Sequence, residues 1–371
     1  MFDLVYNRIT PFNCAIFATI FLVFVFSRIY VADGTLRFDC KRPHYDFSFF
    51  KLFVSGLPMF LLPALQYDVG ADYIAYVRYF LEEIPFTKEP IYGFLNSWLA
   101  DAGFHYQSIF VVTSFLCIYI LLWSILRYSK MPLLSIFLFY VAGFYYIPFN
   151  EIRWGVAIAI TTYSVRYIEE RRLPNFLFGM LLAIGFHYSS VVFIPMYWVY
   201  NIRWSFKWLW IVTLGLVLVR PLIGLAVRIL IEYTRYAHYL GGIYDAGKQA
   251  MLGILVPIAI LLATGLLVRE KNKLCIFYSV CVFVKLWIFI ISEYVPLVGR
   301  FGDYFMIMLI FLIPLTGESI ENVKLRLSYI LSVIICFCGF FFYRTMMTVE
   351  KIDSVSIWRD YVTIFDTVMK W

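Results

Sequence analysis

A series of long, nearly uncharged apolar runs constrains the fold of this chain more than any other feature of its sequence. An α-helix needs about 20 mainly apolar residues to cross the hydrocarbon core of a bilayer, and it satisfies its own backbone hydrogen bonds there. The runs cover residues 11–30, 47–66, 104–126, 132–149, 153–168, 174–201, 207–231, 251–268, 274–292, 301–316 and 327–347. The pattern therefore predicts an all-α, polytopic integral membrane protein.

The composition excludes an ordinary soluble domain. Of the 371 residues, 63% are hydrophobic and only 15% are charged, whereas a soluble domain carries about 25% charged residues. At about 20 residues per helix plus short connections, the chain has room for about 11 or 12 transmembrane helices. No low-complexity linker interrupts it, so we expect a single transmembrane domain over residues 1–371.

The distribution of charge predicts which loops share a side of the membrane, because Lys and Arg collect in cytoplasmic loops. The basic segments, expected in the cytoplasm, contain Arg37, Lys41 and Arg42, Arg127 and Lys130, Arg171 and Arg172, residues 269–273, and Lys324 and Arg326. The segments expected outside the cytoplasm are 67–103, 232–250 and 293–303. The C-terminal tail, 348–371, is mixed in character and suits a membrane interface.

These basic loops fall on one side only if residues 174–201 cross the membrane twice. We therefore predict a hairpin of two short helices with its bend near His187. At about 1.5 Å of rise per residue, such short helices thin the protein locally or line a water-filled cleft. This version predicts twelve crossings with both termini outside.

The cysteines and histidines do not follow a metal-ligand pattern. The seven Cys include no CxxC pair, and the four His include no HxH or HxxxH pair, so we expect no metal site or other cofactor. The chain has no GxGxxG or P-loop motif, which argues against a nucleotide-sugar substrate. The net charge of +7 reflects loop placement, and we expect no nucleic-acid partner.

Acidic and tyrosine side chains are concentrated in the segment after the second apolar run. Asp72, Tyr73 and Tyr76 lie close together, and Glu89 follows before Pro90. Tyr and carboxylate groups together suit sugar binding, because hydroxyls hydrogen-bond and aromatic rings stack on pyranose faces. The alternative is an ordinary polar interfacial helix, with Glu89 beside a proline at a helix start.

Two arginines stand at the outer start of predicted helices, Arg153 and Arg300. Cations are disfavoured at a helix N-terminus, whereas a phosphate binds both a guanidinium and the free N–H groups there. Two such arginines indicate a polyanionic ligand. The alternatives for Arg153 are a snorkelling side chain or an ion pair with Glu151.

His187 lies at the predicted bend, next to the hydroxyls of Ser189 and Ser190. An imidazole with a pKa near 6.5 is a suitable proton acceptor for a sugar hydroxyl. The alternative is a hydrogen-bonded core histidine, and Asp72 is the rival base.

Four short motifs, in order along the chain, resemble those of the EpsG/Wzy-type polysaccharide polymerases, which are membrane glycosyltransferases of the GT-C class. They are V-G-A-D-Y at 69–73, N-x-x-R-x-x-x-A from Asn150, F-H-x-S from Phe186 and R-x-x-x-Y from Arg300. The resemblance covers about residues 60 to 310. The family often carries an arginine shortly before the first motif, where this chain has Gln66.

The resemblance implies a polymerase that transfers a glycan from undecaprenyl pyrophosphate onto a lipid-linked repeat unit, at the periplasmic face of the bacterial inner membrane. The product would be of the O-antigen, capsule or exopolysaccharide type. The expected partners are undecaprenyl-pyrophosphate-linked oligosaccharides, the lipid bilayer, a chain-length regulator and a flippase. The expected catalytic residues are His187 and Asp72, and the expected substrate-binding residues are Arg153, Arg300, Asn150, Tyr73, Tyr76, Glu89, Asp303 and Tyr304.

Two other functions compete with this reading. A transporter or flippase of lipid-linked glycans would show internal repeats and charges spread along a transmembrane path. Another membrane glycan ligase or O-acyltransferase would need a catalytic group that its own donor can reach; an acyltransferase would use a cytoplasmic acyl donor, and His187 is predicted to face the other way.

Overall fold

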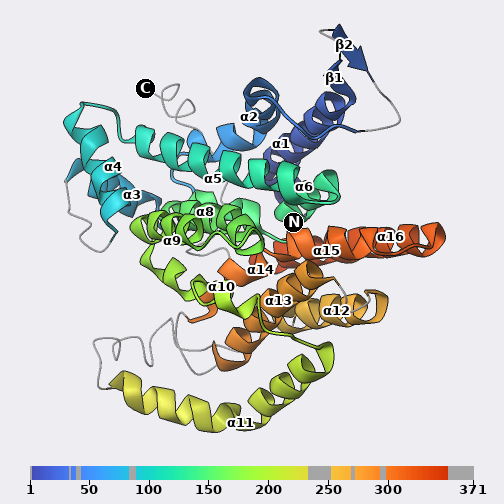
Figure 1. The fold of residues 1–371 in the computed structure, drawn as a ribbon. Coiled ribbons are helices and arrows are strands. Elements are labelled where there is room, and N and C mark those ends of the chain that lie inside the picture. The colour runs from blue at the N-terminus through green and yellow to red at the C-terminus, as the bar shows by residue number, and fades with distance from the viewer. Residues whose placement is uncertain are drawn as a thin grey trace.

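The computed structural model describes residues 2–32, 35–38, 43–82, 89–232, 252–268, 272–292 and 298–349, which form a helical bundle (Figure 1). The α-helices are α1 (Phe2–Arg28), α2 (Phe49–Ala64), α3 (Tyr73–Leu81), α4 (Pro90–Asp101), α5 (Gln107–Tyr128), α6 (Pro132–Val141), α7 (Ile147–Asn150), α8 (Ile152–Glu169), α9 (Leu173–Phe186), α10 (Met196–Val199), α11 (Phe206–Glu232), α12 (Leu252–Leu267), α13 (Lys273–Ser292), α14 (Asp303–Met306), α15 (Leu309–Glu318) and α16 (Val323–Val349). Short 3-10 helices occupy Phe144–Tyr146, Tyr188–Phe193 and Val298–Gly302. The predicted all-α, multi-pass fold is confirmed.

Strands make a minor addition that the sequence did not predict. The four-residue strands β1 (Ile29–Ala32) and β2 (Thr35–Phe38) pair antiparallel, with Ile29 opposite Phe38. They extend beyond the bundle at the end of α1 (Figure 1).

The apolar helices differ in length. Six in the described part of the chain are long and apolar enough to cross a membrane, and a bent pair, 132–141 with 144–150, makes a seventh. Four apolar helices are shorter, at 49–64, 173–186, 188–199 and 254–267. Fewer helices than the expected 11 or 12 therefore meet the length and composition of a span, because those four are short and α8 carries three charged residues.

Side-chain contacts gather the basic loops at one end of the bundle. Arg127 contacts the Asp46 carboxylate at 3.3 Å, and Lys130 contacts that of Glu318 at 3.8 Å. At the same end, the ammonium of Lys273 lies 4.1 Å from the ring centre of Tyr200. Loops distant in sequence thus share one end, as the charge pattern predicts, and which side of the membrane that end faces stays a prediction.

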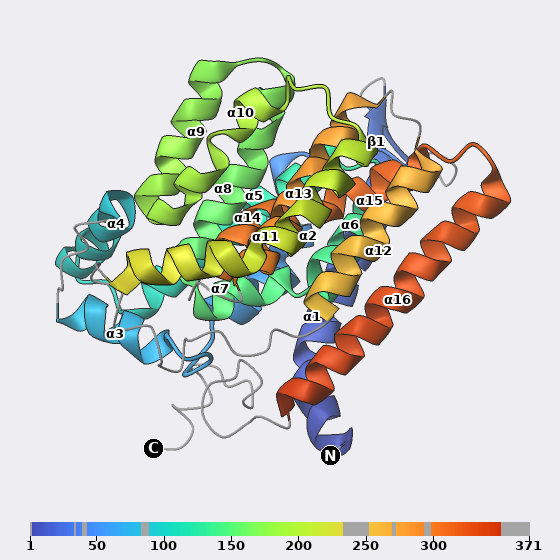
Figure 2. The same ribbon diagram turned by 90° about the horizontal axis from the view of Figure 1, so that it is seen from below.

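The opposite end of the bundle joins the segment after α2 to the end of α7. The backbone N–H of Asp72 donates to the Asn150 side chain at 3.1 Å. The start of α1 and the end of α16 also lie together at one end of the bundle (Figure 2). The predicted loop 232–250 and tail 348–371 lie almost wholly outside the described residues, as do residues 269–271 and 293–297.

The chain doubles back at His187, as predicted. Helix α9 ends at Phe186, His187 adopts an extended backbone (φ −154°, ψ 114°), and a 3-10 helix then leads to α10. The rings of Phe176 and Tyr197 stack at 5.5 Å, which brings the start of α9 beside α10. The two short arms therefore return the chain to the basic end and leave His187 at the opposite end.

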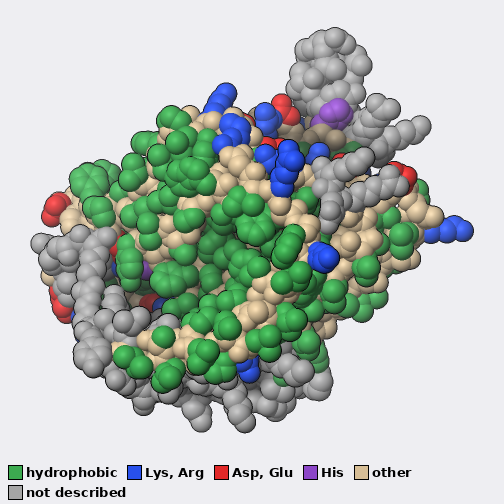
Figure 3. Space-filling view, turned by 60° about the horizontal axis from the view of Figure 1, so that its bottom comes forward, with side chains coloured by type: hydrophobic (Ala, Val, Ile, Leu, Met, Phe, Trp, Pro, Cys, Tyr) green, Lys and Arg blue, Asp and Glu red, His purple; other side chains and the backbone are tan. Residues whose placement is uncertain are grey.

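Helix α8 lies at the centre of the bundle, between α5 and α9 (Figure 1). Gly179 of α9 faces Ser164 of α8 so closely that an added Cβ would lie 2.1 Å from the hydroxyl oxygen. Small residues at such crossings let helices approach closely within a bilayer. At the periphery, α11 and α16 expose large hydrophobic side chains such as Leu218 and Ile335. Hydrophobic side chains cover much of the face in Figure 3, which suits contact with lipid.

The arrangement of the two ends predicts the outcome of cysteine labelling. Asp101 is the last residue of α4 and lies at the end of the bundle opposite the basic loops. Lys130 lies at the end that carries the basic loops. A membrane-impermeant maleimide added to intact cells should label Asp101→Cys, whereas Lys130→Cys should react only after permeabilisation. The unsubstituted chain gives the background. Labelling of both variants from the same side would contradict this topology.

Candidate active site

A small polar cavity lies at the end of the bundle opposite the basic loops. It has a volume of about 60 Å³, enough for a few waters or one phosphate-sized group. It is lined by Asp72, Tyr76, Glu151, Arg153, Trp154, His187 and Arg300. Five of these seven residues were predicted as site residues from the sequence, although they come from four separate segments. The structure therefore brings half of the ten predicted site residues together in one lining.

Glu89 lies behind the cavity and joins two of its walls. The residue is only 2% exposed, and its two carboxylate oxygens contact different partners. Oε2 forms an ion pair with Arg153, and Oε1 accepts from Nδ1 of His187. The carboxylate of Glu89, predicted to bind substrate, is thus buried between two side chains of the protein and holds both in place.

Arg153 lies in the first turn of α8, as predicted. The anion that it contacts in this structure is a carboxylate of the protein itself. Glu89 supplies the negative charge, in place of the Glu151 pair considered from the sequence. The Arg153 guanidinium also lies 5.5 and 5.4 Å from the ring centres of Tyr76 and Tyr92. Its side chain keeps 23% exposure and lines the cavity, so it presents part of its charge there.

His187 has the geometry of an oriented base. Its backbone N–H donates to the Ala183 carbonyl at 2.8 Å, which continues the last turn of α9 and fixes the residue at the bend. Because Glu89 engages Nδ1, Nε2 is the ring nitrogen left to interact with a ligand. A carboxylate at Nδ1 selects this tautomer and stabilises the imidazolium that forms when the ring takes up a proton. The side chain is 24% exposed and faces the cavity.

The opposite wall of the cavity carries acidic groups and a second arginine. Burial raises the pKa of Glu151 to about 6, and the Arg300 guanidinium, 3.4 Å away, opposes that rise. Burial also raises the pKa of Asp72, against the charges of Arg300 and Arg153. Among the described residues, no group of three or more His, Cys, Asp or Glu side chains is placed to hold a metal ion. The acidic groups here face arginines instead.

Two predicted site residues support the turn that carries Asp72. Asn150 accepts the Asp72 N–H and lies against Gly70, where an added Cβ would come within 2.8 Å of its side-chain oxygen. Gly70 has φ +83°, a conformation that suits glycine. Tyr73 points away from the cavity and stacks on Phe110 at 4.8 Å. Neither Asn150 nor Tyr73 lines the cavity.

The other two predicted residues, Asp303 and Tyr304, lie behind Arg300. Asp303 accepts from Nζ of Lys285 at 2.7 Å, and the same ammonium donates to the Gly299 carbonyl at 3.2 Å. Lys285 thus holds both sides of the turn that carries Arg300. A lysine within an apolar helix is itself a functional signal, and Lys285 was not among the predicted site residues.

Tyr304 is fully buried and is not part of the cavity lining. Its hydroxyl hydrogen-bonds the Ser189 hydroxyl at 3.0 Å, and its ring meets Trp154 edge-on at 6.2 Å. It therefore fixes the wall next to His187. Trp154 and Glu151 were not predicted as site residues, although both adjoin Arg153 and its motif in the sequence.

Gln66 occupies the position where the resembling family often has an arginine. Its side chain is fully buried and donates to the Pro148 carbonyl at 3.5 Å, while its own backbone carbonyl accepts from Gln107 at 3.1 Å. This position therefore ties α2 to α7 and does not reach the cavity.

The sequence profile of the EpsG family matches residues 49–355, which include every residue that lines the cavity. The match covers most of the 371 residues of the chain. No curated protein and no solved structure matches the chain.

The burial of Glu89 predicts a loss of stability on its substitution. In Glu89→Ala the Arg153 charge loses its partner, and removing one partner of a buried pair costs about 3–5 kcal/mol. The melting temperature of the purified protein in detergent should fall clearly.

Glu82→Ala is the matched control, because Glu82 pairs with Arg78 on the exposed face of α3. Such surface pairs contribute about 0–1 kcal/mol, so this variant should melt close to the unsubstituted protein. Equal melting temperatures for the two variants would show that Glu89 does not hold the site together.

Proposed function

The chain belongs to the EpsG family, and from that membership and the polar cavity we propose that it is a polysaccharide polymerase acting on lipid-pyrophosphate-linked glycans. Membership itself supports a role of the polysaccharide-polymerase type in a multi-pass membrane protein. The proposal adds the reaction, the donor and the site. The observation that carries it is that His187, held by Glu89, lines one cavity together with Arg153 and Arg300.

The reaction needs a base and a group that stabilises the leaving charge. The hydroxyl of the acceptor sugar gives its proton to Nε2 of His187 and attacks the anomeric carbon of the donor glycan. The bond from that carbon to the lipid pyrophosphate breaks, and its electron pair leaves with the phosphate oxygen. Glu89 stabilises the imidazolium, and the arginines stabilise the developing negative charge.

The two arginines differ in how freely they can meet a phosphate. The side chain of Arg300 is 57% exposed and contacts Glu151 at 3.4 Å, so a stronger anion can recruit it. Arg153 is held by Glu89 and by the Tyr76 hydroxyl. Arg300 is therefore the main candidate for the pyrophosphate, and Arg153 contributes a fixed charge beside it.

Asp72 is the rival base, because its carboxyl group lines the same cavity. The raised pKa of Asp72 favours its neutral form more than is usual for an aspartate, which makes it a better proton acceptor when ionised. Tyr76, whose pKa burial raises to about 12, stays protonated and can donate a hydrogen bond to a sugar.

The proposal places this end of the bundle at the periplasmic face of a bacterial inner membrane. The charge pattern supports that orientation, because the basic loops lie at the other end. Undecaprenyl-pyrophosphate-linked oligosaccharides would be donor and acceptor, and a flippase and a chain-length regulator would act with the protein. The polymer would be of the O-antigen, capsule or exopolysaccharide type.

Substitution of His187 tests the base. His187→Ala and His187→Gln should both lose long polymer and leave single repeat units on their final carrier, because removal of a general base costs about 10²–10⁴ in rate. Gel profiles of surface polysaccharide from cells that express each variant at equal level provide the measurement.

His105→Gln, at an exposed histidine near the start of α5, should leave the polymer profile unchanged. A normal profile from His187→Gln would remove the base role from His187 and transfer it to Asp72. An unchanged surface polysaccharide profile in cells that lack this protein would contradict the polymerase proposal altogether.

Substitution of the arginines by lysine tests the pyrophosphate contacts. A guanidinium holds a phosphate with two parallel hydrogen bonds, while an ammonium acts as a point charge. Arg300→Lys should lower polymer formation by about 10²–10³-fold. Arg153→Lys should also lower it, because an ammonium cannot keep the contacts of Arg153 with both Glu89 and the Tyr76 hydroxyl. Arg78→Lys, on the exposed face of α3, is the control and should have no effect. Near-normal amounts of polymer from both cavity variants would contradict the proposed contacts between these arginines and the pyrophosphate.

A further inference from the structure

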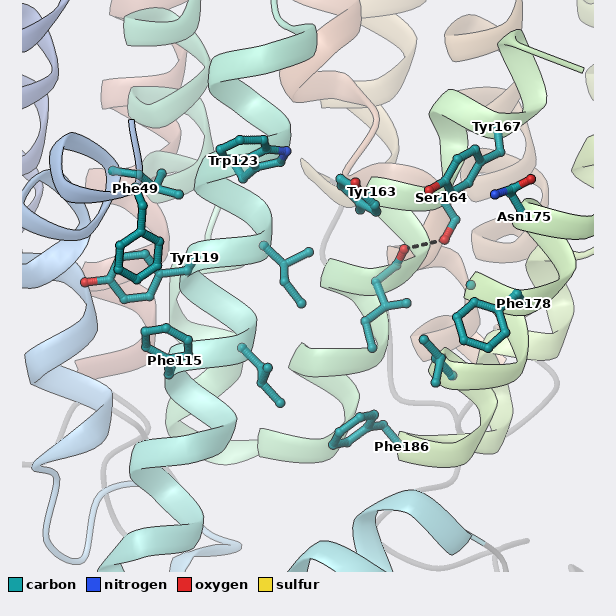
Figure 4. Close-up of a pocket in the computed structure, with 16 residues that line it drawn as sticks. Phe49, Phe115, Tyr119, Trp123, Tyr163, Ser164, Tyr167, Asn175, Phe178 and Phe186 are labelled. Carbon is teal, nitrogen blue, oxygen red and sulfur yellow. Dashed lines mark hydrogen bonds between the residues drawn. The ribbon is translucent and has the colours of Figure 1, made fainter. Parts of the chain in front are cut away.

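A second, much larger cavity opens on the side of the bundle. It has a volume of about 560 Å³ and lies between α2, α5, α8 and α9 (Figure 4). Eight of its 16 lining residues are aromatic, and most of the others are aliphatic. We call this space the side groove. No part of the polymerase site described above uses it.

The side groove ends beside the polar cavity. Phe186 lines the groove at one end, and His187, the next residue, lines the polar cavity. Figure 4 shows Phe186 at one end and Trp123, Tyr167 and Asn175 toward the other. From Asn175 to Phe186 helix α9 rises by roughly 16 Å at about 1.5 Å per residue. The groove therefore runs lengthwise along the bundle, and the lining residue at one of its ends, Phe186, directly precedes His187 of the polar cavity.

Two walls of the groove, α8 and α9, are closely packed against each other, and the rim of the groove is open. The close approach of Gly179 to Ser164 sets the spacing of α8 and α9, and the Ser164 hydroxyl bonds back to the Ile160 carbonyl at 2.7 Å. Phe49 and Phe178 stand at the rim with 73% and 63% exposure, so they do not fill the space. An apolar channel of this kind, between helices in a bilayer, is a site for a hydrocarbon chain.

We propose that the side groove holds the isoprenoid chain of the lipid-linked substrate, with the pyrophosphate of that lipid at the His187 end. The proposal rests on the proposed function, which supplies a substrate with both parts. The apolar groove and the cavity with two arginines match the two parts of such a molecule in the order in which they are joined. Flat aromatic rings along the walls fit a branched, unsaturated chain.

Groove-filling substitutions test the proposal with undecaprenyl pyrophosphate, without sugar, as the probe. Leu182 lines the groove from α9, whereas its neighbour Leu181 is 65% exposed and lies outside the lining. Leu182→Trp should weaken binding of the probe to the purified protein by about tenfold or more, since overpacking of this size costs about one such factor. Leu181→Trp places the same side chain one residue away and should bind as the unsubstituted protein does.

A second groove-filling variant keeps the test valid if Leu182→Trp does not fold. Ile120→Trp fills the groove from α5, on the other wall, and should weaken binding to a similar extent. Unchanged binding by both groove variants would overturn the proposal. Phosphatidylglycerol serves as the competing lipid, and an equal loss of its binding in Leu182→Trp would show a groove for any acyl chain, which also overturns it.

His187→Gln separates this proposal from the polymerase proposal. It should retain the probe in the groove while losing long polymer. If it retains the probe and also makes normal polymer, the groove assignment stands and the base assignment fails. If the groove-filling variants leave both probe binding and polymer unchanged while His187→Gln loses polymer, the base assignment stands and the groove assignment fails.

Discussion

The buried carboxylate of Glu89 is the interaction on which the rest of the site depends. It contacts Arg153 at the start of α8 and His187 at the bend after α9, so one side chain from the start of α4 connects three separate segments. A buried charge is costly unless it is paired and hydrogen-bonded, and here each oxygen has its own partner. The same contacts that make its burial tolerable also position the Arg153 guanidinium and the His187 imidazole in one cavity.

Interruptions in the helices precede or carry residues that line this cavity. The chain bends by 64° between α6 and the α7 segment, breaks again at His187, and passes through a 3-10 turn at Arg300. Irregular backbone in a membrane protein is tolerated where it lines a polar cavity or is buried in protein. At the 3-10 turn that carries Arg300, Lys285 satisfies polar groups of the irregular backbone and its neighbour, because its ammonium donates to the Gly299 carbonyl and to the Asp303 carboxylate. The breaks and the site are thus parts of one arrangement.

Much of the fold and of the site could be predicted from the sequence. Every long apolar run became helical, and the need to keep basic loops on one side predicted the hairpin at His187. Arg153 and Arg300 stood out because charge at the mouth of an apolar run is costly.

The role of Glu89 could not be predicted in this way, because it depends on contacts 64 and 98 residues away in the sequence. Local spacing likewise could not show that Tyr76 faces the cavity while Tyr73 packs under α5. The central claim is that Glu89 holds His187 with its proton on Nδ1 and leaves Nε2 as the base. Nitrogen-15 NMR of the histidine-labelled protein near pH 8, where an ordinary imidazole is neutral, tests it directly. The His187 signals, assigned by their loss in His187→Gln, should show a protonated Nδ1 and an unprotonated Nε2. Protonated Nε2 with unprotonated Nδ1 would contradict the account.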